Sequence, residues 1–120
     1  MTYDPQNIFA KILRGEIPCN KVYEDDFALA FHDIHPQAPI HVLVIPKGPY
    51  LSLADFSRAA PADLLSGFWR AVGAVARQLG LEEAGYRALS NIGGDGGQEV
   101  PHFHVHLFGG RRLGPMLSKG

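Results

Sequence analysis

The apolar residues of the chain recur with a helical period in two stretches, 4–14 and 61–79. In both stretches they return every third or fourth position and therefore share one face of a helix. These positions are Ile8, Phe9, Ile12 and Leu13 in the first stretch, and Leu64, Leu65, Phe68, Trp69, Val72, Val75, Ala76 and Leu79 in the second. The pattern predicts a short helix and one long amphipathic helix that covers a sheet, with Trp69 in the core.

Five other stretches have the alternation or the β-branched content of strands: 21–24, 27–33, 40–45, 86–91 and 102–108. The third of these is almost continuously apolar, which predicts a central strand covered on both faces. The resulting order is helix, three strands, helix and two strands. This order predicts an α+β domain in which helices pack on an antiparallel sheet.

The last predicted strand carries three histidines at alternate positions. They are His102, His104 and His106, and each is followed directly by one apolar residue: Phe103, Val105 and Leu107, respectively. Successive side chains of a strand point to opposite faces, so the histidines share one face and the apolar residues the other. Neighbouring histidine Cα atoms would lie roughly 6.6 Å apart, close enough to share one small ligand.

Three interpretations of this histidine row are open from the residues alone. The row fits a solvated strand face, a zinc site built from neutral imidazoles, or a site of acid–base and nucleophilic catalysis. The glycine-rich stretch 93–98 precedes the row. Such a turn can direct several backbone N–H groups at one anion. We therefore expect a phosphate rather than a metal ion beside the histidines.

Three further residues have ordinary interpretations that the sequence alone leaves open. A lone histidine in an apolar strand, such as His41, is usually a core residue whose polar atoms are satisfied. Asp33 follows a strand and suits a turn cap, while Asn91 precedes the glycine-rich stretch and suits a turn. Their functional roles depend on the resemblance described below.

Composition narrows the class of protein. The 120 residues suit one domain, which we expect to span 1–120. A net charge of −1 without a basic run predicts no nucleic-acid partner. The one cysteine, Cys19, favours a reducing compartment. The first residues lack the pattern of a signal peptide, and no apolar run is long enough to span a bilayer. We therefore expect a cytoplasmic protein without membrane contact.

The stretch 102–108 resembles the signature of the histidine triad (HIT) superfamily, in which three histidines alternate with apolar residues and two apolar residues follow. The stretches 7–18, 30–34 and 36–47 resemble the Hint branch of that superfamily, the nucleoside phosphoramidase-type members. The resemblance runs from about 7 to 111 and leaves a short tail, 112–120. It implies a HIT-like fold, a five-stranded antiparallel sheet with two helices, whose sheet continues across a homodimer.

The resemblance also implies an activity. Purine nucleoside 5′-phosphoramidates, of the AMP-NH2 or AMP-lysine type, would be hydrolysed to the nucleoside monophosphate through a nucleotidyl-histidine intermediate. His104 would be the nucleophile and His106 the general acid, with His102 and His41 in supporting roles. No metal and no cofactor are implied.

The resemblance assigns nucleotide contacts to ten residues: Asp33, Ile34, Asn91, Gly97, Gln98, Glu99, Ile8, Phe9, Ile12 and Phe31. Asp33 would hold the ribose hydroxyls, and the apolar residues would form a purine pocket. Backbone N–H groups at 97–99 would surround the phosphate. We interpret His32 and His35 as incidental.

Two positions depart from the Hint pattern. Gly48 stands where many eukaryotic members have a further histidine, and Glu99 stands where animal members have serine. Because a carboxylate repels phosphate, we expect the Glu99 side chain to point away from it. Three alternatives to the phosphoramidase remain: a dinucleoside polyphosphate hydrolase of the Fhit-like branch, a nucleotide-binding adaptor with weak catalysis, and a zinc protein built on the three histidines.

Overall fold

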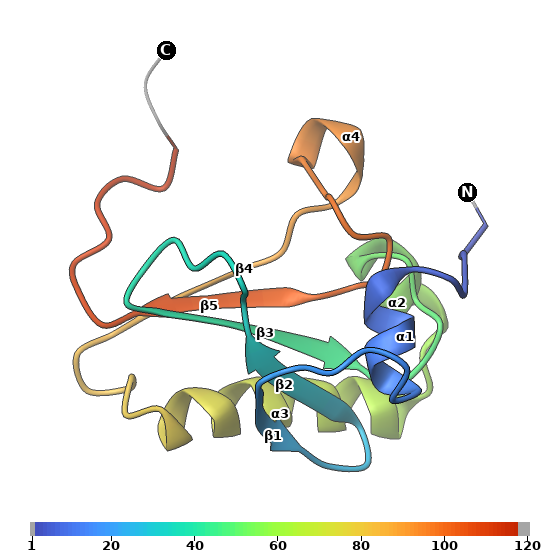
Figure 1. The fold of residues 1–120 in the computed structure, drawn as a ribbon, viewed down its shortest axis with the longest axis horizontal. Coiled ribbons are helices and arrows are strands. Elements are labelled where there is room, and N and C mark those ends of the chain that lie inside the picture. Colours follow the sequence, from blue (N-terminus) through green and yellow to red (C-terminus); the bar gives the residue numbers. More distant parts are fainter. Residues whose placement is uncertain (1, 118–120) are drawn as a thin grey trace.

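A computed structural model describes residues 2–117 of the protein, and a five-stranded antiparallel sheet forms its centre (Figure 1). The strands are β1 (Lys21–Glu24), β2 (Ala28–His32), β3 (Ile40–Pro46), β4 (Arg87–Leu89) and β5 (Val105–Gly109), in the spatial order β1-β2-β3-β5-β4. The predicted α+β class and the central position of β3 are confirmed, and His41 to Pro46 are all buried. The predicted tail, 112–120, lies outside the described residues after Leu117.

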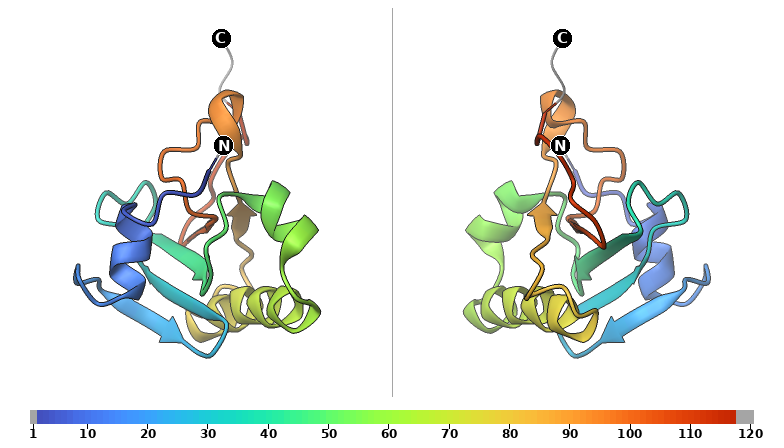
Figure 2. Two further views of the ribbon diagram at one scale, coloured as in Figure 1. Left: turned by 90° about the vertical axis from the view of Figure 1, so that its right-hand side faces the viewer. Right: turned by 90° about the vertical axis from the view of Figure 1, so that its left-hand side faces the viewer.

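Four helical segments connect or cover the strands: α1 (Ile8–Leu13), α2 (Leu53–Ala59), α3 (Ala62–Gln78) and α4 (Gly93–Gly96). Figure 2 shows α1 on one side of the sheet and both α2 and α3 on the other. The two predicted helices correspond to α1 and α3, whereas α2 and α4 were not predicted. None of the helices within 2–117 combines the length and the apolar character that crossing a membrane requires.

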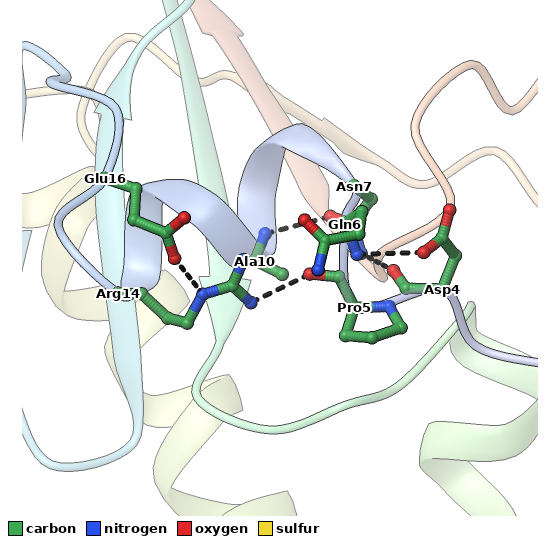
Figure 3. Close-up of polar contacts among 7 residues, drawn as sticks. All are labelled: Asp4, Pro5, Gln6, Asn7, Ala10, Arg14 and Glu16. Carbon is green, nitrogen blue, oxygen red and sulfur yellow. Dashed lines mark hydrogen bonds and ion pairs between the residues drawn. The ribbon is translucent and has the colours of Figure 1, made fainter.

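The first helix begins later than predicted because its N-terminal residues make side-chain contacts instead (Figure 3). Asn7 caps α1, and its side-chain oxygen accepts a hydrogen bond from the Ala10 N–H at 2.9 Å. Asp4 accepts a hydrogen bond from the Gln6 N–H at 2.9 Å, which closes a turn ahead of the helix. The helical period therefore starts at Ile8 and not at Asp4.

Alternation along the strands separates two apolar clusters. On the α3 side of the sheet, the cluster combines strand residues with Phe56 of α2 and with Phe68, Ala71, Val72 and Val75 of α3. The strand residues of this cluster are Ala28, Ala30, Val42, Val44, Val105 and Leu107, and Phe103, just before β5, joins them. On the α1 side, the cluster consists of Phe9, Leu29, Phe31, Leu43 and Ile45. The period-two pattern read from the sequence thus places the scaffold on one face and leaves the other for the histidines.

Two expectations about these elements were wrong in detail. The strand predicted for 102–108 begins only at Val105, because residues before it bond to loops and not to β3 or β4. Phe103 shows this, since its N–H donates to the Tyr50 carbonyl at 2.8 Å. Trp69 is not a core residue: 44% of it is exposed, and only an edge contacts Phe68 and Phe103.

Helix α2 matters for the site because the chain just before it holds the residues that precede β5. Ser52 and Asp55 form a capping box, in which Ala54 N–H donates to Ser52 Oγ and Ser52 N–H donates to Asp55 Oδ1. The same Asp55 also accepts from Leu51 N–H at 2.8 Å. Residues 50–52 are therefore held rigidly where Phe103 bonds to them.

We predict that Ser52→Ala lowers the free energy of unfolding by about 1 kcal/mol, because it removes the buried cap of α2. Urea denaturation at neutral pH measures the change. Ser57→Ala is the matched control, since Ser57 is an exposed serine of the same helix, and it should change the value by less than about 0.5 kcal/mol. Equal effects of the two substitutions would contradict the role of the cap.

Candidate active site

Two adjoining cavities open on the α1 side of the sheet. The first, which we call the polar cavity, has a volume of about 190 Å³ and is lined by Asp33, Asn91, Gly97, Glu99, His104 and His106 among others. The second, the apolar cavity, has a volume of about 330 Å³. Both are bordered by Phe9, Asp33, His35, Leu43, Glu99 and Val100. A larger hollow of about 350 Å³, between β4 and 111–114, contains none of the histidines.

The hydrogen bond of His104 determines which of its ring nitrogens is free. Its Nδ1 lies 2.7 Å from the carbonyl oxygen of His102. A carbonyl only accepts hydrogen bonds, so the proton of the neutral ring sits on Nδ1 and the lone pair on Nε2. Burial lowers the pKa of His104, although the His102 carbonyl, Asp33 and Glu99 oppose that shift. His104 is therefore neutral near pH 7, with an unprotonated nitrogen at the polar cavity.

His102 is fully buried, and both of its ring nitrogens have partners. Its Nε2 donates to the Pro46 carbonyl at 3.1 Å, which leaves the lone pair on Nδ1. The Tyr3 hydroxyl lies 2.6 Å from that Nδ1 and donates to it. Burial lowers the pKa of His102 to about 4, so this imidazole is neutral. His102 is thus a positioning group, and its contact with Tyr3 was not predicted from the sequence.

His41 and His106 form a second pair whose tautomers are also determined. The Gln37 N–H donates to His41 Nδ1 at 3.2 Å, so His41 carries its proton on Nε2. His41 Nε2 lies 3.0 Å from His106 Nδ1 and donates to it. His106 therefore keeps its own proton on Nε2. Burial, together with the neighbouring His104 and His41, lowers the pKa of His106 to about 4, although Asp33 opposes the shift.

Asp33 and Phe108 complete the surroundings of this pair. Asp33 Oδ2 lies 3.5 Å from His41 Nε2, and its charge partly offsets the lowering of the His41 pKa by burial. The ring of Phe108 lies 4.2 Å from the His41 ring and is nearly parallel to the His106 ring, with centroids 5.6 Å apart. The pair of His41 and His106 is therefore in contact with both a carboxylate and an aromatic ring.

The geometry does not suit a zinc ion held by the three histidines of the row. Both nitrogens of His102 and the Nδ1 of His104 are already bonded to protein groups. Within 2–117, a different set, Asp33, His41 and His106, brings one possible ligand atom each within 4.8 Å of one another. In that set, His41 Nε2 and His106 Nδ1 already share one hydrogen bond. That hydrogen bond occupies one possible ligand atom of each histidine in this set.

The glycine-rich stretch differs from the expected phosphate turn. Gly97 N–H donates to the Gly94 carbonyl and Gln98 N–H to the Gly93 carbonyl, so both N–H groups cap α4 instead of facing an anion. The Gln98 side chain donates to the Leu51 carbonyl at 2.7 Å and also anchors the loop. Gly97 does border the polar cavity, with φ of 76°, whereas Gln98 borders neither cavity. The expectation that 97 and 98 surround the phosphate through their N–H groups is corrected accordingly.

Glu99 is exposed and borders both cavities. Its charge counteracts part of the lowering of the His104 pKa. The expectation that its side chain points away from a bound phosphate stays a prediction.

The structure brings together every apolar residue that was expected to contact the base. Ile8, Phe9, Ile12, Phe31 and Ile34 all line the apolar cavity. Sequence reasoning missed further lining residues, namely Ile17, Pro18, Cys19, Asn20, Leu43 and Val100. His32, interpreted as incidental, also lines this cavity. The segment 17–19 has no periodicity that could have indicated it. Leu43 and Val100 could have been found only by knowing which strand and loop adjoin the histidines.

Three polar contributions were missed as well. His35, interpreted as incidental, borders both cavities, and its N–H donates to Asp33 Oδ1 at 2.8 Å. Gln37 sets the His41 tautomer through its backbone. Ser90 Oγ donates to the His104 carbonyl at 2.7 Å and so holds the backbone of His104. Backbone-mediated roles of this kind leave no mark in a single sequence.

Comparison with known proteins gives consistent results. The HIT domain family model matches residues 14–113. An uncharacterized 13.2 kDa HIT-like protein of Azospirillum brasilense is 64% identical over 119 residues, which cover 99% of this chain and 98% of that protein. The purine nucleoside phosphoramidase of Escherichia coli K12 is 47% identical over 113 residues, 94% of each chain.

A solved structure agrees with the fold. The HIT family hydrolase from Clostridium thermocellum superposes with a TM-score of 0.85 at 39% identity, over 94% of this chain and 97% of that one.

We predict that the protein loses stability as the pH falls from about 6.5 to about 5. The pKa of His102 is about 4 in the folded protein but about 6.5 in an unfolded chain, so only the unfolded state gains a proton in this window. The free energy of unfolding should then fall by up to about 1.4 kcal/mol per pH unit from this histidine. Urea denaturation at several pH values measures the slope.

His102→Asn should reduce that slope by the share of His102 and leave the share of His106, whose pKa is also about 4. His32→Asn, at an exposed histidine of β2, should keep the full slope. Carboxylates titrate mostly below this pH range and contribute little to the slope of the unfolding free energy within it. A wild-type protein with the same unfolding free energy at pH 5 and pH 7 would contradict the neutral, buried state of His102.

Proposed function

The chain belongs to the HIT domain family, and from this premise we propose that it hydrolyses purine nucleoside 5′-phosphoramidates. Substrates of the AMP-NH2 or AMP-lysine type would be cleaved at the phosphorus–nitrogen bond to give the nucleoside monophosphate. The observation that carries the proposal is the unprotonated Nε2 of His104 at a polar cavity that adjoins an apolar one. The name of the E. coli relative supports this choice of substrate over a dinucleoside polyphosphate.

In the first step, His104 Nε2 attacks the α-phosphorus of the substrate. A nitrogen–phosphorus bond to His104 forms while the bond to the leaving amine breaks, which gives a nucleotidyl-histidine intermediate. The proton on Nδ1 stays hydrogen-bonded to the His102 carbonyl. That bond stabilises the positive charge that develops on the ring as the new bond forms.

His106 is the proposed general acid. Its Nε2 is directed by the hydrogen bond from His41 to its Nδ1. The negative phosphate of a bound substrate favours the protonated form of a nearby imidazole and so raises its pKa above the low value of the free protein. The His106 imidazolium then transfers its proton to the leaving amine. Neutral His106 afterwards accepts a proton from the water that displaces His104 and releases the monophosphate.

The apolar cavity is the proposed site of the base. Its volume of about 330 Å³ and its isoleucine and phenylalanine lining suit a flat heterocycle. Asp33 borders both cavities and would accept hydrogen bonds from the ribose hydroxyls between base and phosphate. Asn91 borders the polar cavity and, with the Glu99 N–H, would contact the phosphate. Gly97 has no side chain and would contribute only by letting the backbone approach the phosphate closely.

The remaining parts of the proposal concern the setting of the protein. We propose one domain over 1–120 that acts as a homodimer, as the family resemblance implies. We propose the cytoplasm as its location, because a free Cys19 suits a reducing compartment. Its partners would be the nucleotide substrate and a second copy of the chain.

We predict that the effect of replacing His106 depends on the leaving group of the substrate, whereas the effect of replacing His104 does not. For an adenosine 5′-phosphoramidate with an alkylamine leaving group, His106→Ala should lower kcat by roughly 10²- to 10⁴-fold, the contribution typical of a general acid. For the p-nitrophenyl ester of AMP, whose leaving group needs no proton, the loss should be much smaller. His104→Ala should abolish turnover of both substrates, because it removes the nucleophile.

Intact-mass spectrometry after rapid acid-free quenching supplies the direct readout. Wild type should carry one added nucleotidyl group during turnover of the ester, and His104→Ala none. Turnover by His104→Ala at the wild-type rate would overturn the mechanism. Binding of nucleotide by wild type without turnover of either substrate would favour the adaptor, and turnover of diadenosine polyphosphates alone would favour the Fhit-like alternative.

We predict that Ile34→Ala raises KM roughly three- to tenfold with little change in kcat, because Ile34 is 84% exposed at the apolar cavity and would be covered only by a bound base. Steady-state kinetics with the phosphoramidate measure both constants. The matched control is Ile92→Ala, at an exposed isoleucine that borders neither cavity. Unchanged KM in Ile34→Ala would place the base elsewhere.

A further inference from the structure

The segment ahead of α1 reaches the histidine row through a single side chain. The Tyr3 hydroxyl lies 2.6 Å from His102 Nδ1, and the two rings meet edge-on with centroids 5.7 Å apart. Ninety-nine positions separate these residues in the chain. The contact therefore joins the N-terminal segment to the segment that carries the proposed nucleophile.

This contact supplies the second of the two hydrogen-bonding partners that the His102 ring requires. His102 has no exposed surface, so water cannot satisfy a ring nitrogen that the protein leaves unpaired. The Pro46 carbonyl accepts from Nε2, and only a donor can then satisfy Nδ1. The Tyr3 hydroxyl is that donor. Together the two partners select one tautomer and one ring orientation of His102.

Residues 102–104 need such contacts because the sheet does not hold them. Strand β5 begins at Val105, so 102–104 lie outside the ladder with β3 and β4. Their position depends on Phe103 N–H to the Tyr50 carbonyl, on Ser90 Oγ to the His104 carbonyl, and on the two bonds of the His102 ring. The His102 carbonyl, which accepts from His104 Nδ1, belongs to this same segment. A shift of His102 therefore shifts the group that selects the His104 tautomer.

Hydrogen bonds hold the two residues that follow Tyr3, Asp4 and Pro5, against α1 (Figure 3). The Asn7 side chain caps α1 at Ala10 and donates to the Asp4 carbonyl at 2.8 Å. Arg14, at the other end of α1, donates to the Pro5 carbonyl at 2.8 Å and pairs with Glu16. These bonds tie the two residues that follow Tyr3 to both ends of α1. The Tyr3 side chain is thus aimed by the helix that also supplies Phe9 to the cavities.

We propose that Tyr3 is a positioning residue for His104, which it orients through the placement of His102. The proposal rests on the proposed function for its kinetic consequence, but its structural consequence is independent of any substrate. Loss of the hydroxyl leaves the buried His102 Nδ1 without a donor, while the Pro46 carbonyl still selects the tautomer of the ring. The His102 ring and its backbone carbonyl then shift, the hydrogen bond from His104 Nδ1 weakens, and fewer molecules present the His104 lone pair to a substrate.

Tyr3→Phe tests the proposal, since it removes only the hydroxyl and keeps the ring contact. The matched control is Tyr23→Phe, because the Tyr23 hydroxyl makes a 2.7 Å hydrogen bond to Asp25 in the β1–β2 hairpin, outside both cavities. The readouts are ¹⁵N chemical shifts of the histidine ring nitrogens, kcat and KM with the alkylamine phosphoramidate, and the thermal midpoint. The ¹⁵N shifts separate a protonated ring nitrogen from an unprotonated one in each histidine.

Tyr3→Phe should change the ¹⁵N shifts of both His102 and His104 and lower kcat roughly tenfold, with KM within about twofold of wild type. Tyr23→Phe should leave the shifts and kcat unchanged, whatever its effect on the thermal midpoint. Unchanged His102 and His104 shifts in folded Tyr3→Phe would overturn the proposal. So would a lower thermal midpoint accompanied by wild-type kcat and wild-type shifts, which is the result of a merely structural contact.

The two proposals fail in distinguishable ways. If wild type does not hydrolyse the phosphoramidate, the proposed function fails, and the ¹⁵N shifts alone still decide whether Tyr3 governs His102 and His104. If wild type is active and Tyr3→Phe matches it in both kcat and shifts, the proposed function stands and the role of Tyr3 is refuted.

Discussion

The site depends on one constraint, that a buried neutral imidazole must have a partner at each nitrogen that water cannot reach. Burial keeps His102, His104 and His106 neutral by lowering their pKa values. Because each neutral ring has one donor and one acceptor nitrogen, a single fixed neighbour decides the tautomer of the whole ring. The Pro46 carbonyl does this for His102, the His102 carbonyl for His104, and the Gln37 N–H for His41 and, through it, for His106. Three backbone groups thus determine where four histidines carry their protons.

The sheet supplies the two surfaces that this arrangement needs. Its α3 side is filled by aromatic contacts among Phe56, Phe68 and Phe103, whose ring centroids lie 4.8 to 5.3 Å apart. Its α1 side is covered by a helix of only six residues, which leaves room for the cavities beside Phe9. A long helix on both sides would have buried the histidines completely. The unequal covering of the two faces is therefore what turns a histidine-bearing strand into an accessible site.

Glu99 gives this site an electrostatic character of its own. A carboxylate at the junction of the two cavities opposes the binding of a phosphate, yet it also favours a positively charged His104. In the proposed mechanism, positive charge develops on that ring when it bonds to phosphorus, so the same charge that weakens ground-state binding would stabilise the ring in the transition state. Under that proposal, Glu99 would favour turnover over tight binding of the nucleotide.

The sequence by itself determined the class of fold, the central strand and the separation of faces, because the period of two and the period of 3.6 are local properties of strands and helices. It also identified the histidine row and, through a family resemblance, the apolar residues that line one cavity. Tertiary structure alone decided the start of β5, the capping of α4 by Gly97 and Gln98, the placement of Glu99 and the contact of Tyr3 with His102. Each of these depends on which backbone N–H or carbonyl from a distant segment lies within hydrogen-bonding distance. No local pattern of side chains encodes that distance.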